Sequence, residues 1–106
     1  MTHGDREMSS ISSIALSGMN AAQTALNAAA NNVANSNTPG FRRDQVQQSQ
    51  QADDGVTTSV SKASADGAAL VDDLVAQLQA KNAFLANLQV FKTSNKTFGA
   101  LLDTSA

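Results

Sequence analysis

The stretch "ANSNTPGFRR", Ala34–Arg43, decides how the chain is organised, because it holds the only proline and separates two segments of helical pattern. Thr38 precedes that proline and is therefore biased away from helical backbone angles. Pro39 suits the second position of a β-turn, and Gly40 suits the third position, where a type II turn requires a positive φ. Phe41 leaves the turn as an apolar anchor. We expect the first helix to end here and the chain to turn sharply.

The sequence on both sides of this turn predicts helices, one within residues 9–37 and one within residues 68–106. The first carries a seven-residue repeat of larger apolar residues and alanines, and the second repeats leucine and phenylalanine at the same spacing, as coiled coils do. We predict that the helices pack through Met19, Leu26, Val33, Leu78, Phe84, Leu85, Asn87, Leu88 and Phe91. Asn31, Asn32 and Asn35 can cap the first helix or bond a neighbouring helix, and the sequence leaves their partners open.

The segment between the helices, residues 38–67, is rich in Gln, Ser, Thr, Asp and Gly and is expected to be a polar linking arm. Within it, Gly55–Lys62 could form a short extended piece or weak hairpin, since Val and Thr favour strands. Residues 1–8 are expected to be a flexible N-terminus. The predicted fold is therefore all-α, with two long terminal helices paired as an antiparallel coiled-coil hairpin and joined by a polar loop that could hold a short β-hairpin.

Composition argues against several classes of function. The formal net charge of −2 gives no broad attraction for nucleic acid. There is no cysteine, no run of about 18 apolar residues that would span a membrane, and no cleavable secretion signal at the N-terminus. His3 is the only histidine and lies in a polar terminal segment, and no phosphate-binding loop or nucleophile motif occurs. We expect no catalytic site, no cofactor and no metal.

Two motifs resemble the bacterial flagellar rod and hook protein family. "SGMNAAQTALNAAANNVANSNTPGFRR", residues 17–43, is similar to that family's N-terminal signature, in which a helix ends in a pattern like A-N-N-I/L-A-N-x-x-T-x-G-F-K/R. "VDDLVAQLQAKNAFLANLQVFKTSNKTFGALL", residues 71–102, is similar to its C-terminal pattern V-E-E-M-V-x-x-I-x-A-Q-R-x-Y-x-A-N-x-x-V-I-x-T. Lys81 and Asn82 replace the usual Gln-Arg pair, and Phe84 replaces the usual tyrosine. The first motif places Asn31, Asn32, Asn35, Thr38, Pro39, Gly40 and Phe41 on the signature.

The resemblance implies a structural subunit of the flagellar basal-body rod, closest to a minimal member of the proximal-rod type because the middle segment is short. Its partners would be other axial subunits, copies of itself and the type III export apparatus, and its place would be the periplasmic rod region. Sustained apolar seams need partners, and one interface repeated around a screw axis gives a tube. The sequence leaves open whether Arg42 and Arg43 meet acidic groups of a neighbouring subunit, the peptidoglycan layer or only solvent.

An alternative class is a small cytoplasmic coiled-coil chaperone or adaptor, or a paralogue of the rod proteins that does not assemble. Such a protein would be folded and self-contained at low concentration, whereas a rod subunit would gain order on assembly.

Overall fold

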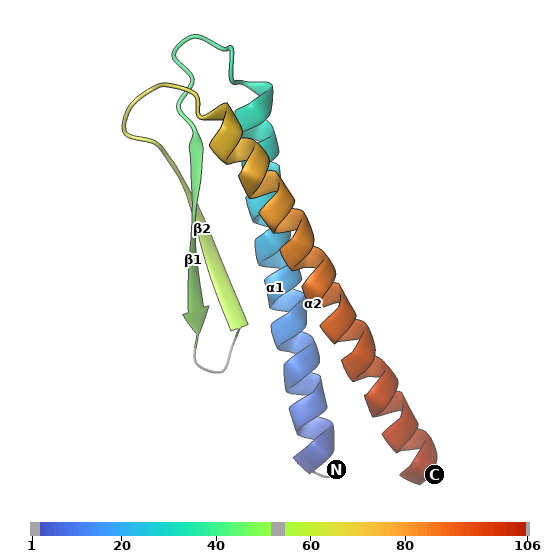
Figure 1. The fold of residues 1–106 in the computed structure, drawn as a ribbon. Coiled ribbons are helices and arrows are strands. Elements are labelled where there is room, and N and C mark those ends of the chain that lie inside the picture. The colour runs from blue at the N-terminus through green and yellow to red at the C-terminus, as the bar shows by residue number, and fades with distance from the viewer. Residues whose placement is uncertain (1–2, 52–54, 106) are drawn as a thin grey trace.

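The computed structural model describes residues 3–51 and 55–105 and shows two long helices with a β-hairpin between them. The elements follow in the order α1 (His3–Ala34), β1 (Asp44–Gln51), β2 (Gly55–Lys62) and α2 (Leu70–Ser105). The helices lie side by side and run in opposite directions, so both chain ends lie at the same end of the molecule (Figure 1). The molecule measures 62 × 22 × 13 Å, and its length is that of the helices, since 36 helical residues span about 54 Å.

The expected all-α class is wrong, because an antiparallel two-stranded sheet lies between the helices. Two strands of eight residues each pair in a continuous register from Asp44↔Lys62 to Gln51↔Gly55. Val46 and Val60 lie opposite each other, but β1 is otherwise mostly glutamine, which gives a weak strand signal in the sequence. The hairpin forms because helix side chains bond its two ends, an interaction that propensity does not reveal.

Helix boundaries also differ from the sequence pattern. α1 begins at His3 rather than near Ser9, and no proline interrupts this stretch. The flexible terminus expected for residues 1–8 lies partly outside the described residues. α2 begins at Leu70, with Asp72 and Asp73 in its first turn, where negative charge complements the helix dipole.

The two helices meet through small side chains. The buried apolar residues are Ala15, Ala21, Ala22, Ala28 and Ala29 of α1 and Ala80 of α2, all 2–8% exposed. Asp73 and Ser94 of α2 are also buried. They lie seven and fourteen residues from Ala80 and therefore on the same face of the helix. Alanine lets helix backbones approach closely but buries little apolar area per residue. The two helices therefore lie close together with little apolar area buried between them, and their larger apolar side chains lie near the surface.

The residues predicted to pack the helices lie beside this alanine seam or away from it. Leu78 and Leu85 are 59% and 50% exposed. The others are half-buried: Met19, Leu26, Val33, Phe84, Asn87, Leu88 and Phe91. Packing of these side chains against further helices stays a prediction.

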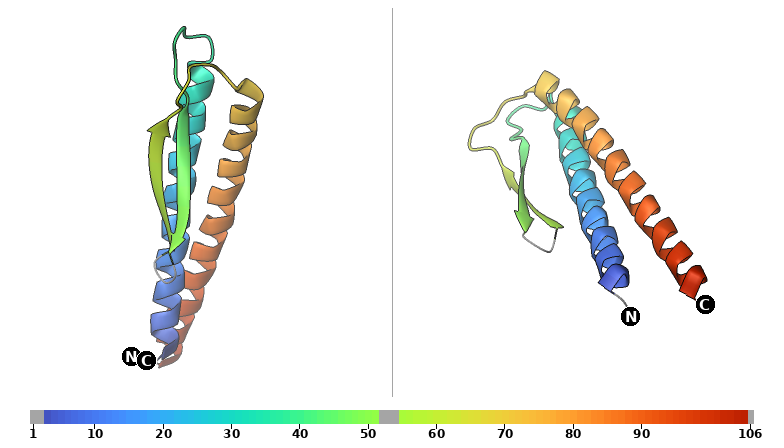
Figure 2. Two further views of the ribbon diagram at one scale, coloured as in Figure 1. Left: turned by 90° about the vertical axis from the view of Figure 1, so that its left-hand side faces the viewer. Right: turned by 60° about the horizontal axis from the view of Figure 1, so that its bottom comes forward.

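The hairpin lies along α1 (Figure 2), and hydrogen bonds to Asn32 and Ser17 attach its two ends to that helix. The backbone N–H of Ala63 bonds the C=O of Arg43 at 2.8 Å, so this is a hydrogen-bonded pair of the ladder. Hydrogen-bonded and non-hydrogen-bonded pairs alternate in antiparallel sheets. Asp44, Val46, Gln48 and Gln50 therefore direct their backbone N–H and C=O groups away from β2.

Candidate functional site

The corner at Thr38–Phe41 is a β-turn built on the end of α1. The N–H of Phe41 bonds the C=O of Thr38 at 3.2 Å, and Gly40, the third residue, has φ +74°. Asn35 supports the turn from the helix side: its Nδ2 donates to the backbone O of Asn31 at 2.9 Å, and its Oδ1 accepts from Thr38 Oγ1 at 3.2 Å. Pro39 and Gly40 are exposed at the tip. The turn sends the chain back toward the hairpin.

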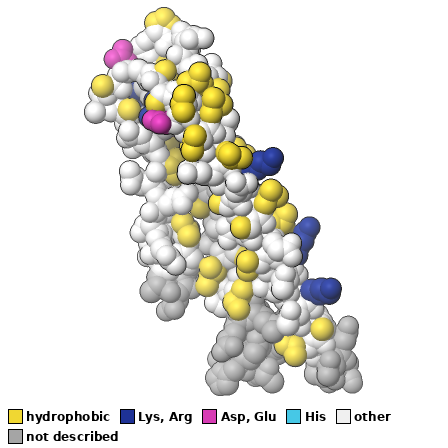
Figure 3. All heavy atoms as spheres, viewed as in Figure 1, with side chains coloured by type: hydrophobic (Ala, Val, Ile, Leu, Met, Phe, Trp, Pro, Cys, Tyr) yellow, Lys and Arg dark blue, Asp and Glu magenta, His cyan; other side chains and the backbone are white. Residues whose placement is uncertain are grey.

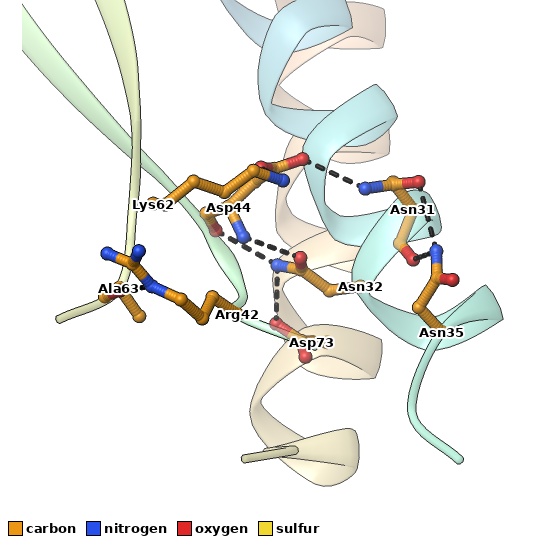
Figure 4. A network of polar contacts seen from close by, with 8 residues as sticks. All are labelled: Asn31, Asn32, Asn35, Arg42, Asp44, Lys62, Ala63 and Asp73. Carbon is orange, nitrogen blue, oxygen red and sulfur yellow. Dashed lines mark hydrogen bonds and ion pairs between the residues drawn. The ribbon is translucent and has the colours of Figure 1, made fainter. Parts of the chain in front are cut away.

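Asn32 joins three elements through one buried carboxamide (Figure 4). It is 3% exposed. Its Oδ1 accepts from the backbone N–H of Asp44 at 2.7 Å, and its Nδ2 donates to the backbone O of Asp44 at 3.0 Å and to Asp73 Oδ1 at 3.3 Å. The amide thus takes the place of a third strand against the first residue of β1 and also bonds α2.

Arg43 and Asp73 form a second bridge at the same place. Arg43 Nε donates to Asp73 Oδ2 at 3.0 Å, and Arg43 Nη2 bonds Asp73 Oδ1. Asp73 is buried, with 3% of its side chain exposed, while 25% of the Arg43 side chain is exposed. The hydrogen bond to Asp73 raises the pKa of the Arg43 guanidinium above its usual value. This two-point contact holds the start of β1 against the start of α2.

Asp44 and Lys62 close the base of the hairpin with an ion pair across the two strands. The hydrogen bond from Lys62 lowers the pKa of the Asp44 carboxyl below its usual value, and a hydrogen bond from Asn31, 3.0 Å from Nδ2 to Oδ2, acts in the same sense. The Lys62 ammonium also lies 5.2 Å from the centre of the Phe41 ring, within cation–π range. We call Asn31, Asn32, Arg43, Asp44, Lys62 and Asp73 together the polar clamp.

The far end of the hairpin is fixed to α1 by Ser17 and Gly55. Ser17 Oγ accepts from the N–H of Val56 at 3.1 Å and donates to the C=O of Ile14 at 2.7 Å. Gly55 has φ +85°, and a Cβ there would lie 2.0 Å from Ser17 Oγ. Only glycine fits this contact without movement of α1 or the hairpin.

Asn87 lies against α1, where Gly18 leaves room for it. A Cβ on Gly18 would lie 2.6 Å from Asn87 Oδ1. The Asn87 amide donates to the C=O of Ala83 at 2.8 Å, within its own helix. Asn87 thus lies close to Gly18 of α1, and its role in helix packing stays a prediction.

An apolar surface runs along the side of α2 that faces away from α1. Its side chains are between 45% and 72% exposed, and they gather over the beginning of α2 (Figure 3). We call these residues the outer stripe: Leu70, Val71, Leu74, Val75, Leu78 and Leu85. Exposed Lys81, Lys92 and Lys96 follow along the same helix. Exposed apolar patches of this kind mark interaction sites in soluble proteins.

The structure brings Asn31, Asn32, Asn35 and Thr38 together around the corner and places Phe41 beside Lys62. Arg42 bonds the C=O of Ala63, so the two arginines that the sequence left open both have partners within the chain.

Sequence reasoning missed several bonding residues of the site: Ser17, Asp44, Gly55 and Asp73. A signal existed for Asp73 alone, because its spacing of seven and fourteen from Ala80 and Asn87 puts a carboxylate on the seam of the helix.

The polar side chains of the site hold the hairpin and the two helices together. Within residues 3–51 and 55–105, no three His, Cys, Asp or Glu side chains gather so as to hold a metal ion. Neither helix, over the residues described, has the length and hydropathy needed to span a membrane.

Comparison with known proteins gives one family. The model of the family described as Flagella basal body rod protein matches residues 13–42, which is 30 of the 106 residues. The match covers α1 from Ser13, the turn and the first arginine after it, and it confirms the resemblance to the flagellar rod proteins over these residues. It supports a role related to the flagellar basal body rod, in a family whose description is structural rather than enzymatic. A search of the curated proteins found no match.

Proposed function

We propose that this protein is a structural subunit of the bacterial flagellar basal-body rod, of the minimal proximal-rod type. In this proposal it is exported through the flagellar type III apparatus and assembles in the periplasmic rod region by coiled-coil packing of its helices against other axial subunits and its own copies. The family match at residues 13–42 supports the flagellar context.

The observation that carries the assembly proposal is the outer stripe. The helices pair through alanine, and the larger side chains Leu74, Leu78 and Leu85 remain 47–59% exposed. Burying the exposed half of such a side chain contributes about 1 kcal/mol. Burying the six side chains of the outer stripe against another apolar helix face would therefore be strongly favourable. A single copy of the chain leaves them exposed.

The polar clamp has a separate part in the proposal. It fixes the corner, the hairpin and the start of α2 relative to α1, so each copy would enter the assembly with its outer stripe already oriented. A rigid subunit loses less conformational entropy on binding than a flexible one. The family signature residues Asn31 and Asn32 belong to this clamp, and Asn35, Thr38 and Gly40 build the adjoining turn.

The test is a double substitution in the outer stripe, Leu74→Ser with Leu78→Ser, in cells that lack the wild-type chain. We expect normal secretion into the medium but at least a tenfold loss of the chain from purified hook–basal bodies, with loss of swimming. Lys81→Ser, an exposed change on the same helix, is the matched control and should swim normally. Wild-type incorporation of the double variant would overturn the proposed assembly face.

A further inference from the structure

A groove runs between the hairpin and the helix pair. It has a volume of about 680 Å³ and is closed at one end by Asn32, Arg43 and Asp73 of the polar clamp and lined at the other by Ile14 and Gly18. Its floor is made of small residues of both helices, among them Ala25, Ala28, Ala76 and Ala83. The hairpin side is mostly β1, represented by Val46, Gln48 and Gln50. The hairpin is thus held at its two ends and stands off the helices in between.

The β1 side of this groove presents unpaired backbone groups. The register places the N–H and C=O groups of Val46, Gln48 and Gln50 outward from β2. No hydrogen bond from another element reaches these groups within residues 3–51 and 55–105. Asp44 is the preceding residue of β1 whose backbone groups point away from β2. The carboxamide of Asn32 bonds both the N–H and the C=O of Asp44, as the backbone of a third strand would.

The size and charge of the groove restrict its occupant. A strand residue fills roughly 160 Å³ at the usual rise, strand spacing and sheet spacing, so the groove holds about four residues. The charged groups of its lining are already compensated, since Arg43 pairs with Asp73 and Asp44 pairs with Lys62. A charged side chain entering here would lose water without gaining a partner. The alanine floor lets a backbone approach closely.

We propose that this groove binds an extended, uncharged segment of a neighbouring axial subunit, which adds to β1 as a third strand. Strand addition at a free edge supplies affinity through main-chain hydrogen bonds, and the lining selects the side chains. The identity of the donor as an axial subunit rests on the proposed function, whereas the strand-addition site itself does not. Small or β-branched uncharged residues such as Val, Thr, Ser and Ala fit the groove.

The test uses the purified full chain and a synthetic peptide, GVTTSVS, which copies the uncharged strand residues 55–61 of this sequence. We expect hydrogen exchange at the amides of Val46, Gln48 and Gln50 to slow at least tenfold when millimolar peptide is added. A peptide of the same sequence with a fully N-methylated backbone cannot donate main-chain hydrogen bonds and should have no effect.

Two chain variants locate the binding. Ala25→Leu fills the groove floor and should weaken the peptide effect at least tenfold, whereas Ala86→Leu, exposed and outside the groove, should leave it unchanged. Unchanged exchange at the three amides, equal protection at Thr58 and Val60 on the β2 edge, or full binding to Ala25→Leu would each overturn the proposal. The measurement needs no flagella, so it can fail or succeed independently of the proposed function.

Discussion

The two ends of the helix pair are built differently. At the end with the corner, a buried carboxamide and a buried ion pair join α1, the hairpin and α2 through Asn32, Arg43 and Asp73. At the end with the chain termini, the described contacts include one hydrogen bond between side chains, Ser12 Oγ to Asn95 Oδ1 at 3.1 Å, and a shallow pocket of about 320 Å³ beside Ile11. The chain fixes the corner end with buried polar groups, whereas an exposed hydrogen bond joins the two helices at the other end.

Arg43→Ala would break the fixed end most severely. It leaves the Asp73 carboxylate buried without its cation, and losing one partner of such a pair costs about 3 kcal/mol of unfolding free energy. Urea denaturation of the purified chain measures this loss. Arg42→Ala is the matched control, since Arg42 is exposed and its bond among the described residues goes to the C=O of Ala63, and it should cost less than about 1 kcal/mol. Equal losses for both variants would show that the ion pair does not hold the fixed end.

Gly55→Ala would detach the far end of the hairpin. The added Cβ meets Ser17 Oγ at 2.0 Å in a backbone of φ +85°, so we expect a loss of about 2 kcal/mol from strain and the broken Ser17 bond. Gly40→Ala separates the two causes, because Gly40 has φ +74° but no atom within 4 Å of the added Cβ. It should cost about 1 kcal/mol in the same urea experiment. The hairpin contact is contradicted if Gly40→Ala costs as much as Gly55→Ala.

Asn32→Ala tests the carboxamide that replaces a strand. It leaves the N–H and C=O of Asp44 without their partner, which costs about 2 kcal/mol. Asn31→Ala removes an exposed hydrogen bond to the Asp44 carboxyl and should cost less, about 0.5 kcal/mol. Hydrogen exchange at the Asp44 amide should accelerate in the first variant alone. An unchanged Asp44 amide in Asn32→Ala would refute the bridging role.

Acid should loosen the base of the hairpin. Because the pKa of Asp44 is lowered in the folded state, its contribution to stability is present above the ordinary aspartate pKa of about 4 and is lost as pH falls through the folded pKa below that value. Urea midpoints between pH 6 and pH 3 should fall more for the wild type than for Asp44→Asn. Parallel curves for the two proteins would exclude the contribution of Asp44.

The end of the helix pair with the chain termini should tolerate the loss of the hydrogen bond between Ser12 and Asn95. Ser12→Ala removes an exposed hydrogen bond to Asn95 and should change the unfolding free energy by less than about 0.5 kcal/mol. A loss as large as that of Asn32→Ala would remove the contrast between the two ends.

The sequence was informative where a local rule applies. The turn at Thr38–Phe41 follows from the restriction that proline imposes and the freedom of glycine at positive φ. The motif around Asn31 and Asn32 pointed to the flagellar rod proteins, and the match at residues 13–42 confirmed that resemblance. These features depend on neighbours in the chain.

Features that depend on distant residues were not predictable in the same way. β1 pairs because Asn32 bonds its first residue, and the start of β2 docks on α1 because Ser17 meets Gly55 and Val56. In α2 the seam is also rotated from the expected one, since heptad patterns mark apolar faces without saying which face meets the helix of the same chain. Alanine fills the seam within the chain, and Leu78 and Leu85 are left outside.

Mass spectrometry of purified hook–basal bodies from the source cell, washed with detergent and salt, is the most direct test of assembly as an axial subunit. We expect this chain in the particles at several copies each. Recovery of the chain only from the cytoplasm, with intact flagella, would contradict assembly and favour a chaperone, an adaptor or a paralogue that does not assemble.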